Sequence, residues 1–179
     1  MSKRSLVVAL AVLFSFPTLA AVQKTGTSDA SFTGKGPAGF KLEGKTQELN
    51  LQDAGGAVKI IVPLANLKTG IDLRDKHMRE KYLEVQKHPD AVLEVPWSAI
   101  TLPEEGKSLS GKAKGKMTLH GKTKDVTFSY TVKRTGATYA ATGSVPLNIK
   151  EFDINIPSYL GVTVKPDIDT NVAFSFTKS

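Results

Sequence analysis

Histidine has the most versatile chemistry of the residue types in this chain, and the sequence contains three: His77, His88 and His120. Their imidazole rings could ligate zinc or exchange protons near neutral pH. Their spacing argues against a metal site, because the chain has no H-x-x-x-H or H-E-x-x-H pair. His120 precedes Gly121 in a turn, which favours a structural role. The sequence therefore predicts no metal site.

Carboxylates, hydroxyls and thiols do not strengthen the case for catalysis. Asp72, Asp75 and Glu80 surround His77 in a charged segment and could act with it as acids or bases. Ser158 lacks the glycine-rich elbow that exposes a nucleophilic serine. The sequence contains no cysteine, which excludes thiolate ligands and cysteine nucleophiles. We therefore expect a protein that is not an enzyme and has no catalytic cofactor.

The first twenty residues have the character of an export signal. Lys3 and Arg4 form a basic start, residues 5–16 form an apolar run, and small residues follow up to a cleavage point after position 20. The run is shorter than the about 20 apolar residues of a membrane-spanning helix, although an uncleaved anchor remains the alternative. The predicted organisation is a signal peptide at 1–20 and one domain at 21–179, secreted into a bacterial periplasm.

The net charge is modest, +7 for the whole chain and +5 after removal of Lys3 and Arg4. A charge of this size could favour a transient contact with an anionic membrane surface. Six lysines lie in two adjoining predicted strands or the turn between them, where apolar residues alternate with them: Lys107, Lys112, Lys114, Lys116, Lys122 and Lys124. That pattern is typical of the solvent face of a hairpin. We therefore expect no nucleic-acid partner, and either a monomer or a homodimer.

Alternation of apolar and polar residues dominates the chain after the signal segment. Residues 122–134 and 168–176 are the clearest examples, with every second side chain apolar or aromatic over much of each segment. Such alternation gives a strand one buried and one exposed face, as in an antiparallel sheet. Glycine-containing turns separate about eight such segments. A barrel of that size could enclose a small ligand, whereas a sandwich would be packed solid.

Residues 69–95 interrupt the strand pattern with a charged, helical stretch. Asp72 is predicted to cap this helix at its N-terminus. Met78, Tyr82 and Leu83 lie on its apolar side, so they are predicted to face inward over one end of the barrel. A single helix on a sheet scaffold indicates a lid or a pocket wall.

Three blocks of sequence resemble the YceI-like family. Residues 74–79 (RDKHMR) and 82–89 (YLEVQKHP) are similar to its R-D-x-H-hydrophobic and F-L-x-V-x-x-x-P motifs. Residues 115–124 (GKMTLHGKTK) resemble its G-x-L-T-x-H-G-x-T-K turn, and residues 149–153 (IKEFD) resemble its late loop with an aromatic after a basic residue. The resemblance covers essentially the whole chain after the signal segment.

This resemblance implies an all-β fold: an antiparallel, eight-stranded, lipocalin-like barrel with one inserted α-helix near residues 72–83. It also implies an exported protein that sequesters or carries a long-chain apolar lipid, of isoprenoid or quinone type, in an elongated cavity. The alternative is a small extracytoplasmic stress or interaction protein whose barrel is filled by side chains and holds no lipid.

The candidate ligand-binding residues come from the inward strand faces, the helix and the late loop. They are Phe40, Leu42, Ile60, Leu73, His77, Met78, Tyr82, Leu83, Leu93, Phe128, Tyr130, Phe152, Ile154, Tyr159, Phe174 and Phe176. An inward apolar residue of a barrel belongs to the solid core about as often as to a ligand wall, so about half of this set is expected to be packing. His77 would either hydrogen-bond a lipid head group or link the helix to the barrel.

Overall fold

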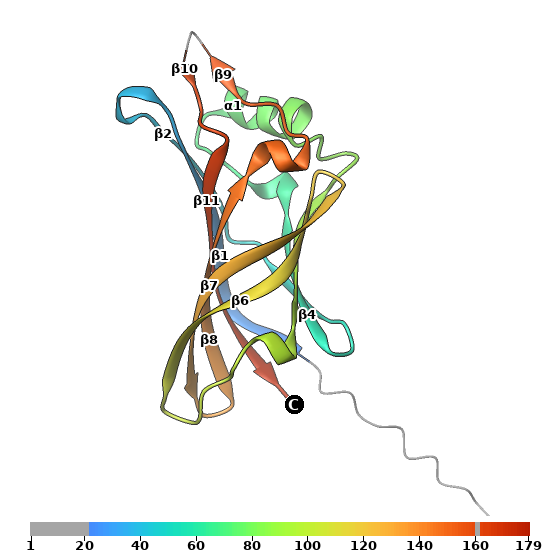
Figure 1. The fold of residues 1–179 in the computed structure, drawn as a ribbon, viewed down its shortest axis with the longest axis vertical. Helices are drawn as coiled ribbons and strands as arrows, with labels where there is room; N and C mark the ends of the chain where they lie inside the picture. The colour runs from blue at the N-terminus through green and yellow to red at the C-terminus, as the bar shows by residue number, and fades with distance from the viewer. Residues whose placement is uncertain (1–21, 160–161) are drawn as a thin grey trace, which may run out of the picture.

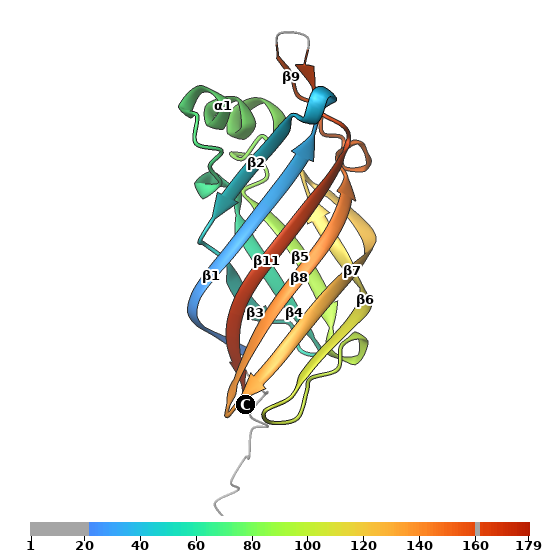
Figure 2. The ribbon, with the colours of Figure 1, turned by 90° about the vertical axis from the view of Figure 1, so that its left-hand side faces the viewer.

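Nine antiparallel strands form one sheet in the computed structural model, which describes residues 22–159 and 162–179. The sheet order is β2-β1-β11-β8-β7-β6-β5-β4-β3, and Figure 2 shows β1, β11, β8 and β7 side by side. The strands are β1 (Val22–Lys35), β2 (Lys41–Thr46), β3 (Asn50–Asp53), β4 (Ala57–Pro63), β5 (Asp90–Pro96), β6 (Ser108–Leu119), β7 (Lys122–Thr135), β8 (Thr138–Asn148) and β11 (Asp167–Lys178). The short strands β9 (Ser158–Tyr159) and β10 (Val162–Thr163) pair separately.

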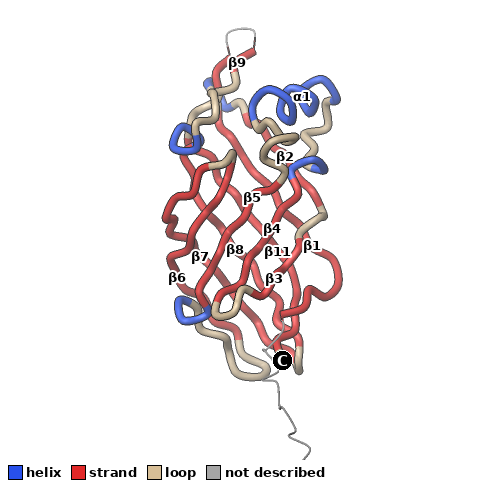
Figure 3. Tube along the Cα trace, turned by 90° about the vertical axis from the view of Figure 1, so that its right-hand side faces the viewer, coloured by secondary structure: helices blue, strands red, loops and turns tan. Residues whose placement is uncertain are grey.

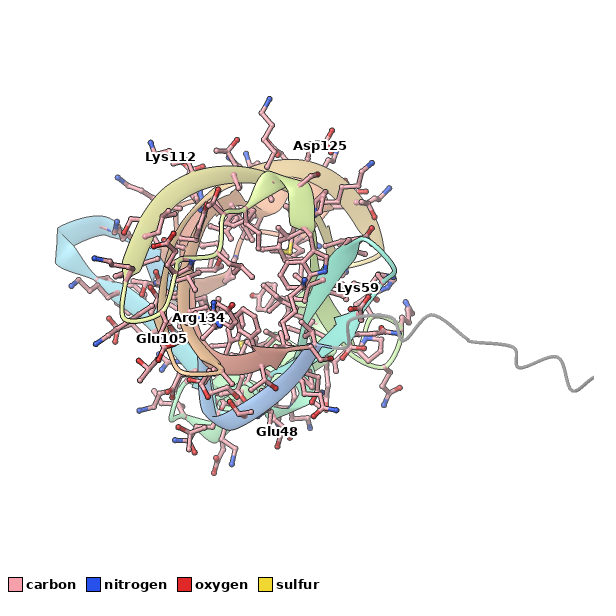
Figure 4. The ribbon with its side chains drawn as sticks, turned by 90° about the horizontal axis from the view of Figure 1, so that it is seen from below. Glu48, Lys59, Glu105, Lys112, Asp125 and Arg134 are labelled. Carbon is pink, nitrogen blue, oxygen red and sulfur yellow. The ribbon has the colours of Figure 1, made fainter. Side chains whose placement is uncertain are left out.

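The sheet closes into a barrel through the corner between its two edge strands. β2 and β3 stand at opposite ends of the strand order, yet only residues 47–49 connect them. Ser28 of β1 donates a hydrogen bond from its hydroxyl to the Gln47 carbonyl oxygen at 2.8 Å, and Leu49 is fully buried. The corner is thereby held against β1, and the strands curl round a central axis (Figure 4).

The predicted all-β antiparallel barrel with an inserted helix is confirmed, but its main sheet has nine strands rather than eight. Residues 41–53 form two short strands, β2 and β3, one on each side of the corner. β3 has four residues, of which only Leu51 is apolar, so the sequence alternation does not reveal it as a separate strand.

Alternation along the strands places the apolar side chains inside. In β7, Phe128 and Val132 are buried while Thr127 and Lys133 are exposed. The register sets Phe128 opposite Ala113 of β6, which is also buried. The outward faces carry the charges, and Figure 4 shows Lys112 and Asp125 pointing away from the barrel.

Helix α1 (Asp72–His77) lies over one end of the barrel and runs directly into a π-helical turn at Met78–Tyr82 (Figures 1 and 3). The helical segment expected near residues 72–83 is therefore present. The predicted cap is wrong, because Ile71 occupies the N-cap position and Asp72 is the first helical residue. The carboxylate that organises this end belongs to Asp75, which accepts hydrogen bonds from Thr69.

Short 3₁₀ turns connect several of the strands. They span Pro37–Gly39, Leu64–Asn66, Trp97–Ala99 and Ile149–Phe152. Within residues 22–159 and 162–179, no helical segment has an apolar stretch long enough to cross a bilayer.

Candidate functional site

An apolar cavity of about 570 Å³ occupies the half of the barrel nearest α1. Its wall comes from the inward side chains of β1, β2, β4, β5, β6, β8 and β11 and from the loops at this end. The apolar wall residues on the strands include Ala30, Phe32, Leu42, Ile60, Val62, Ala91, Leu93, Met117, Leu119, Val145, Leu147, Ile168 and Val172. Most are aliphatic, so the wall offers a long ligand contact area but few hydrogen bonds.

The cavity ends where the inner row of β11 changes from aliphatic to aromatic residues. Ile168, Thr170 and Val172 line the cavity, whereas Phe174 and Phe176, further along the same row, do not. Phe176 stacks on Tyr139 with ring centroids 5.2 Å apart and lies 6.4 Å from Trp97 and 6.0 Å from Phe174. We call these four residues the aromatic plug, since their rings pack together in the part of the barrel that the cavity does not reach.

The mouth of the cavity lies under α1 and carries exposed apolar side chains. Phe40, Ile71 and Leu73 line it and are 39%, 54% and 58% exposed. Met78, further along the helical segment, also lines the cavity but is buried. We call Phe40, Ile71 and Leu73 the apolar rim.

Three polar side chains of the wall, those of Thr69, Arg74 and Thr170, are hydrogen-bonded within the protein. The Thr170 hydroxyl donates a hydrogen bond to the Val145 carbonyl oxygen at 2.8 Å. Arg74 reaches the cavity, but its guanidinium donates to the Thr69 hydroxyl and carbonyl oxygens, both at 2.7 Å. His77 is exposed at the mouth, so it is not the buried link to the barrel that was one of its two predicted roles.

A compact hydrogen-bond cluster joins the first turn of α1 to the loop that precedes it. The buried Asp75 carboxylate accepts hydrogen bonds from the Thr69 backbone N–H at 2.7 Å and from its hydroxyl at 2.5 Å. Burial alone would raise the pKa of Asp75, but these bonds and the nearby Arg79 and Arg74 lower it below its ordinary value. Arg74 and Asp75, the R-D pair of the sequence motif, thus both hydrogen-bond to Thr69.

Ten of the residues predicted to bind ligand lie together on the cavity wall. They are Phe40, Leu42, Ile60, Leu73, His77, Met78, Tyr82, Leu83, Leu93 and Ile154. Five others are not on it: Phe174 and Phe176 belong to the aromatic plug, Phe128 and Tyr130 pack together with ring centroids 6.1 Å apart, and Phe152 is buried in its 3₁₀ turn. The side chain of Tyr159 lies outside the described part of the structure. A role of the ten in binding stays a prediction.

The sequence analysis missed much of the wall on β1 and β8. Phe32, Val145 and Leu147 line the cavity, as does Val164 in the segment before β11. Phe32 lies directly over Gly44, whose missing Cβ would stand 2.2 Å from the Phe32 ring. Alternation within β1 and β8 is the signal that could have identified the strand residues.

The structure brings two of the three histidines together, although with a different carboxylate from those predicted. His88 and His120 lie edge to face with ring centroids 4.9 Å apart, and Glu84 Oε2 is 3.3 Å from His120 Nε2. The carboxylates considered beside His77 take no part in this cluster. The six predicted solvent-face lysines of β6, β7 and the adjoining turns are exposed, as expected for the outside of a barrel.

Fold and cavity together define a β-barrel that encloses an apolar chamber under a helical lid. The YceI-like domain family matches residues 18–176, and the chain belongs to this family. No curated protein sequence matches the chain.

Solved structures with the same fold share little sequence identity with it. A polyisoprenoid binding domain from Saccharophagus degradans, implicated in plant cell wall breakdown, has a TM-score of 0.71 at 16% identity, covering 90% of this chain and 99% of that one. BcnA of Burkholderia cenocepacia has a TM-score of 0.65 at 19% identity, covering 83% and 95%. A YceI protein of Campylobacter jejuni has a TM-score of 0.51 at 13% identity, covering 100% and 99%.

Proposed function

We propose that this protein binds a long-chain apolar lipid, of isoprenoid or quinone type, inside the barrel and carries or sequesters it without altering it chemically. The observation that supports this proposal is the apolar cavity of about 570 Å³. That volume lies within the range of about 300–1,000 Å³ typical of small-molecule sites. Covering about 400 Å² of ligand surface at about 25 cal/mol per Å² is worth on the order of 10 kcal/mol before the cost of association.

The name of one structural neighbour agrees with this proposal. The domain from Saccharophagus degradans is described as polyisoprenoid binding, and its fold matches nearly the whole of this chain. The cavity of this chain has the properties that such a ligand needs, an aliphatic wall and few unpaired polar groups. An unsatisfied polar wall would instead penalise a hydrocarbon tail.

We further propose that the protein works in the periplasm, after cleavage of residues 1–20, and exchanges its lipid at a membrane surface. The apolar rim supports this step, because exposed apolar side chains at a cavity mouth favour contact with a lipid interface. Exposed Lys41 and Lys76 lie close to the rim in the sequence and would attract anionic head groups.

The direct test is to extract the purified protein with organic solvent and analyse the extract by mass spectrometry. A recurring isoprenoid or quinone-type lipid at about one molecule per chain supports the proposal. Protein that yields no lipid, that shows no quenching of Trp97 fluorescence when a quinone is added, and from which no added polyprenol can be recovered by extraction, would refute it. That result would favour the stress or interaction protein without a lipid ligand.

The helical lid provides a second test of the same function. Replacing both Tyr82 and Leu83 by alanine removes two wall residues at the mouth, so lipid retention should fall while the circular-dichroism signal of the sheet persists. Loss of folding would instead show that these residues are core. The double variant Lys81→Ala and Glu80→Ala is the matched control, since both side chains are exposed on the same segment.

A further inference from the structure

Glu84, His88 and His120 converge at the outer side of the cavity wall, from two separate parts of the chain. Glu84 and His88 lie in the segment between the π-helical turn and β5, and His120 lies in the turn between β6 and β7. Their side chains each offer a ligand atom, and these atoms all lie within 4.8 Å of one another. All three residues are partly buried.

The hydrogen bond of His120 decides which of its ring nitrogens is free. His120 Nδ1 lies 3.0 Å from the Phe152 carbonyl oxygen, which can only accept, so Nδ1 carries the hydrogen. In the neutral ring, Nε2 then carries a lone pair. Metal-binding histidines commonly have this arrangement, in which a backbone carbonyl orients the ring and directs the other nitrogen to the ion.

The free nitrogen faces an acceptor rather than a donor. His120 Nε2 is buried and has no hydrogen-bond partner, although Glu84 Oε2 lies 3.3 Å from it. Lys87 Nζ donates a hydrogen bond to the other carboxylate oxygen, Oε1, at 2.7 Å. A cation between His120 Nε2 and Glu84 Oε2 would satisfy both atoms.

We propose that Glu84, His88 and His120 form a binding site for a divalent transition-metal ion, with Zn²⁺ as the best match. Two imidazole nitrogens and one carboxylate oxygen are a ligand set that suits zinc and its neighbours in the first transition row. Calcium and magnesium prefer sites made entirely of oxygen ligands. Partial exposure leaves the remaining coordination position to a water molecule.

The spacing requires only a small closure around the ion. Zinc ligands at about 2.0–2.2 Å from the metal in tetrahedral geometry stand roughly 3.3 Å from one another. The Glu84–His120 distance already has this value, and His88 has the further distance to move. Gly121 makes room for it, because a Cβ at that position would stand 2.7 Å from His88 Cε1.

The backbone at the site is held in an uncommon conformation. Glu84 and His120 have positive φ angles of 44° and 51°, as does Asp153, directly after Phe152, at 55°. Only one further non-glycine residue in the described part of the chain, Ala38, has a positive φ. His120 and Gly121 are the two residues of the tight turn between β6 and β7, where positive φ is the norm, and Asp153 caps the 3₁₀ turn Ile149–Phe152, so turn geometry accounts for the angles of His120 and Asp153.

Titration of the purified, untagged protein with Zn²⁺ in competition with a chromogenic chelator tests the proposal. The expected result is one zinc ion per chain. His88→Ala and Glu84→Gln should each weaken zinc binding by more than about tenfold, the lower end of the effect of losing an outer-shell partner. His77→Ala is the matched control, because this third histidine lies at the cavity mouth outside the cluster, and its zinc affinity should equal that of the unaltered protein.

Histidine ring signals in ¹⁵N NMR give a second reading that does not depend on variants. Added Zn²⁺ should shift the ring signals of His88 and His120 and leave those of His77 in place. Protein that binds no zinc, or variants that bind it as tightly as the unaltered chain, would overturn the proposal. A proton shared between His120 and Glu84 would then be the positive charge, and the contact would be an ion pair.

Discussion

The Asp75 carboxylate accepts two hydrogen bonds from Thr69, one from the backbone N–H at 2.7 Å and one from the hydroxyl at 2.5 Å. This pair closes the loop that leads into α1. The Arg74 guanidinium donates two hydrogen bonds to the same threonine, one to the Thr69 hydroxyl oxygen and one to the Thr69 carbonyl oxygen. These contacts fold the loop onto the first turn of α1, and the backbone pair between Lys45 of β2 and Lys68, directly before Thr69, joins that loop to the barrel.

Replacing Asp75 by asparagine should lower the free energy of unfolding by about 1–3 kcal/mol, since it weakens buried hydrogen bonds to a charged acceptor. Denaturant unfolding measures this loss. The control is Asp72→Asn, at an exposed position whose side chain caps nothing, and it should change stability by less than about 0.5 kcal/mol. Equal effects of the two variants would show that the Thr69 cluster is not what holds the helix.

The same carboxylate should make stability depend on acid. The pKa of Asp75 is lower in the folded protein than its ordinary value of 3.8, so the unfolded chain binds the proton more tightly. Its contribution is complete above the ordinary value, shrinks as the pH falls below it, and is lost once the pH passes below the folded pKa. The stability difference between the unaltered protein and Asp75→Asn, followed by unfolding at pH values from neutral downward, should decline in that window. A difference that grows on acidification would contradict this.

Filling the cavity should abolish lipid binding without loss of the fold. Ile60→Trp places an indole in the cavity, whereas Lys59→Trp, its neighbour on β4, places the same group on the outer face. Lipid recovered by extraction should fall at least about tenfold for the first variant and stay unchanged for the second. If both variants retain the lipid, then the ligand is bound elsewhere.

The aromatic plug should contribute to the stability of the fold rather than to lipid binding. Phe176 is buried against Tyr139, Phe174 and Trp97, and Phe176→Ala should cost about 3–5 kcal/mol of unfolding free energy. Thermal or denaturant unfolding measures the cost. Extraction should still yield lipid from the folded variant, and its absence would assign the plug to the binding surface.

The apolar rim should govern exchange with membranes. Replacing Ile71 and Leu73 together by serine removes two exposed apolar side chains from the mouth, so transfer of a fluorescent polyprenol to anionic vesicles should slow by about tenfold or more. Lipid retention in the absence of vesicles should change little. Leu73 is the neighbour of Arg74, which hydrogen-bonds to Thr69. The thermal stability of the variant should therefore be measured to confirm that α1 remains in place.

Alternation in the sequence was sufficient to predict an antiparallel sheet, because one face of each strand is buried and the other is exposed to solvent, and the resemblance to the YceI-like family then implied a barrel. Alternation could not predict where the cavity ends. Val172 and Phe174 stand in the same inward row of β11, and a period of two treats them alike; only the packing of Phe174 and Phe176 with residues of β8 and the Trp97 turn distinguishes plug from wall. The position of the plug therefore comes from tertiary packing.

The histidine cluster was hidden from the sequence for a different reason. No short motif links Glu84 and His88 to His120, because β5 and β6 must pair before these segments meet. The positive φ angles of Glu84 and His120 are also not the default for those residue types. The R-D motif, by contrast, did point to the lid, and its two residues both contact Thr69.

A barrel closed at one end by four aromatic rings has consequences for selectivity. On the proposed function, a chain-like lipid that enters under α1 would lie with its tail toward these rings and its head group at the opening. The distance between the opening and the rings would then limit the length of the bound tail. A longer tail would leave carbon atoms in water, and a shorter one would leave part of the cavity empty. Homologous chains of different length would then be expected to bind with different affinity.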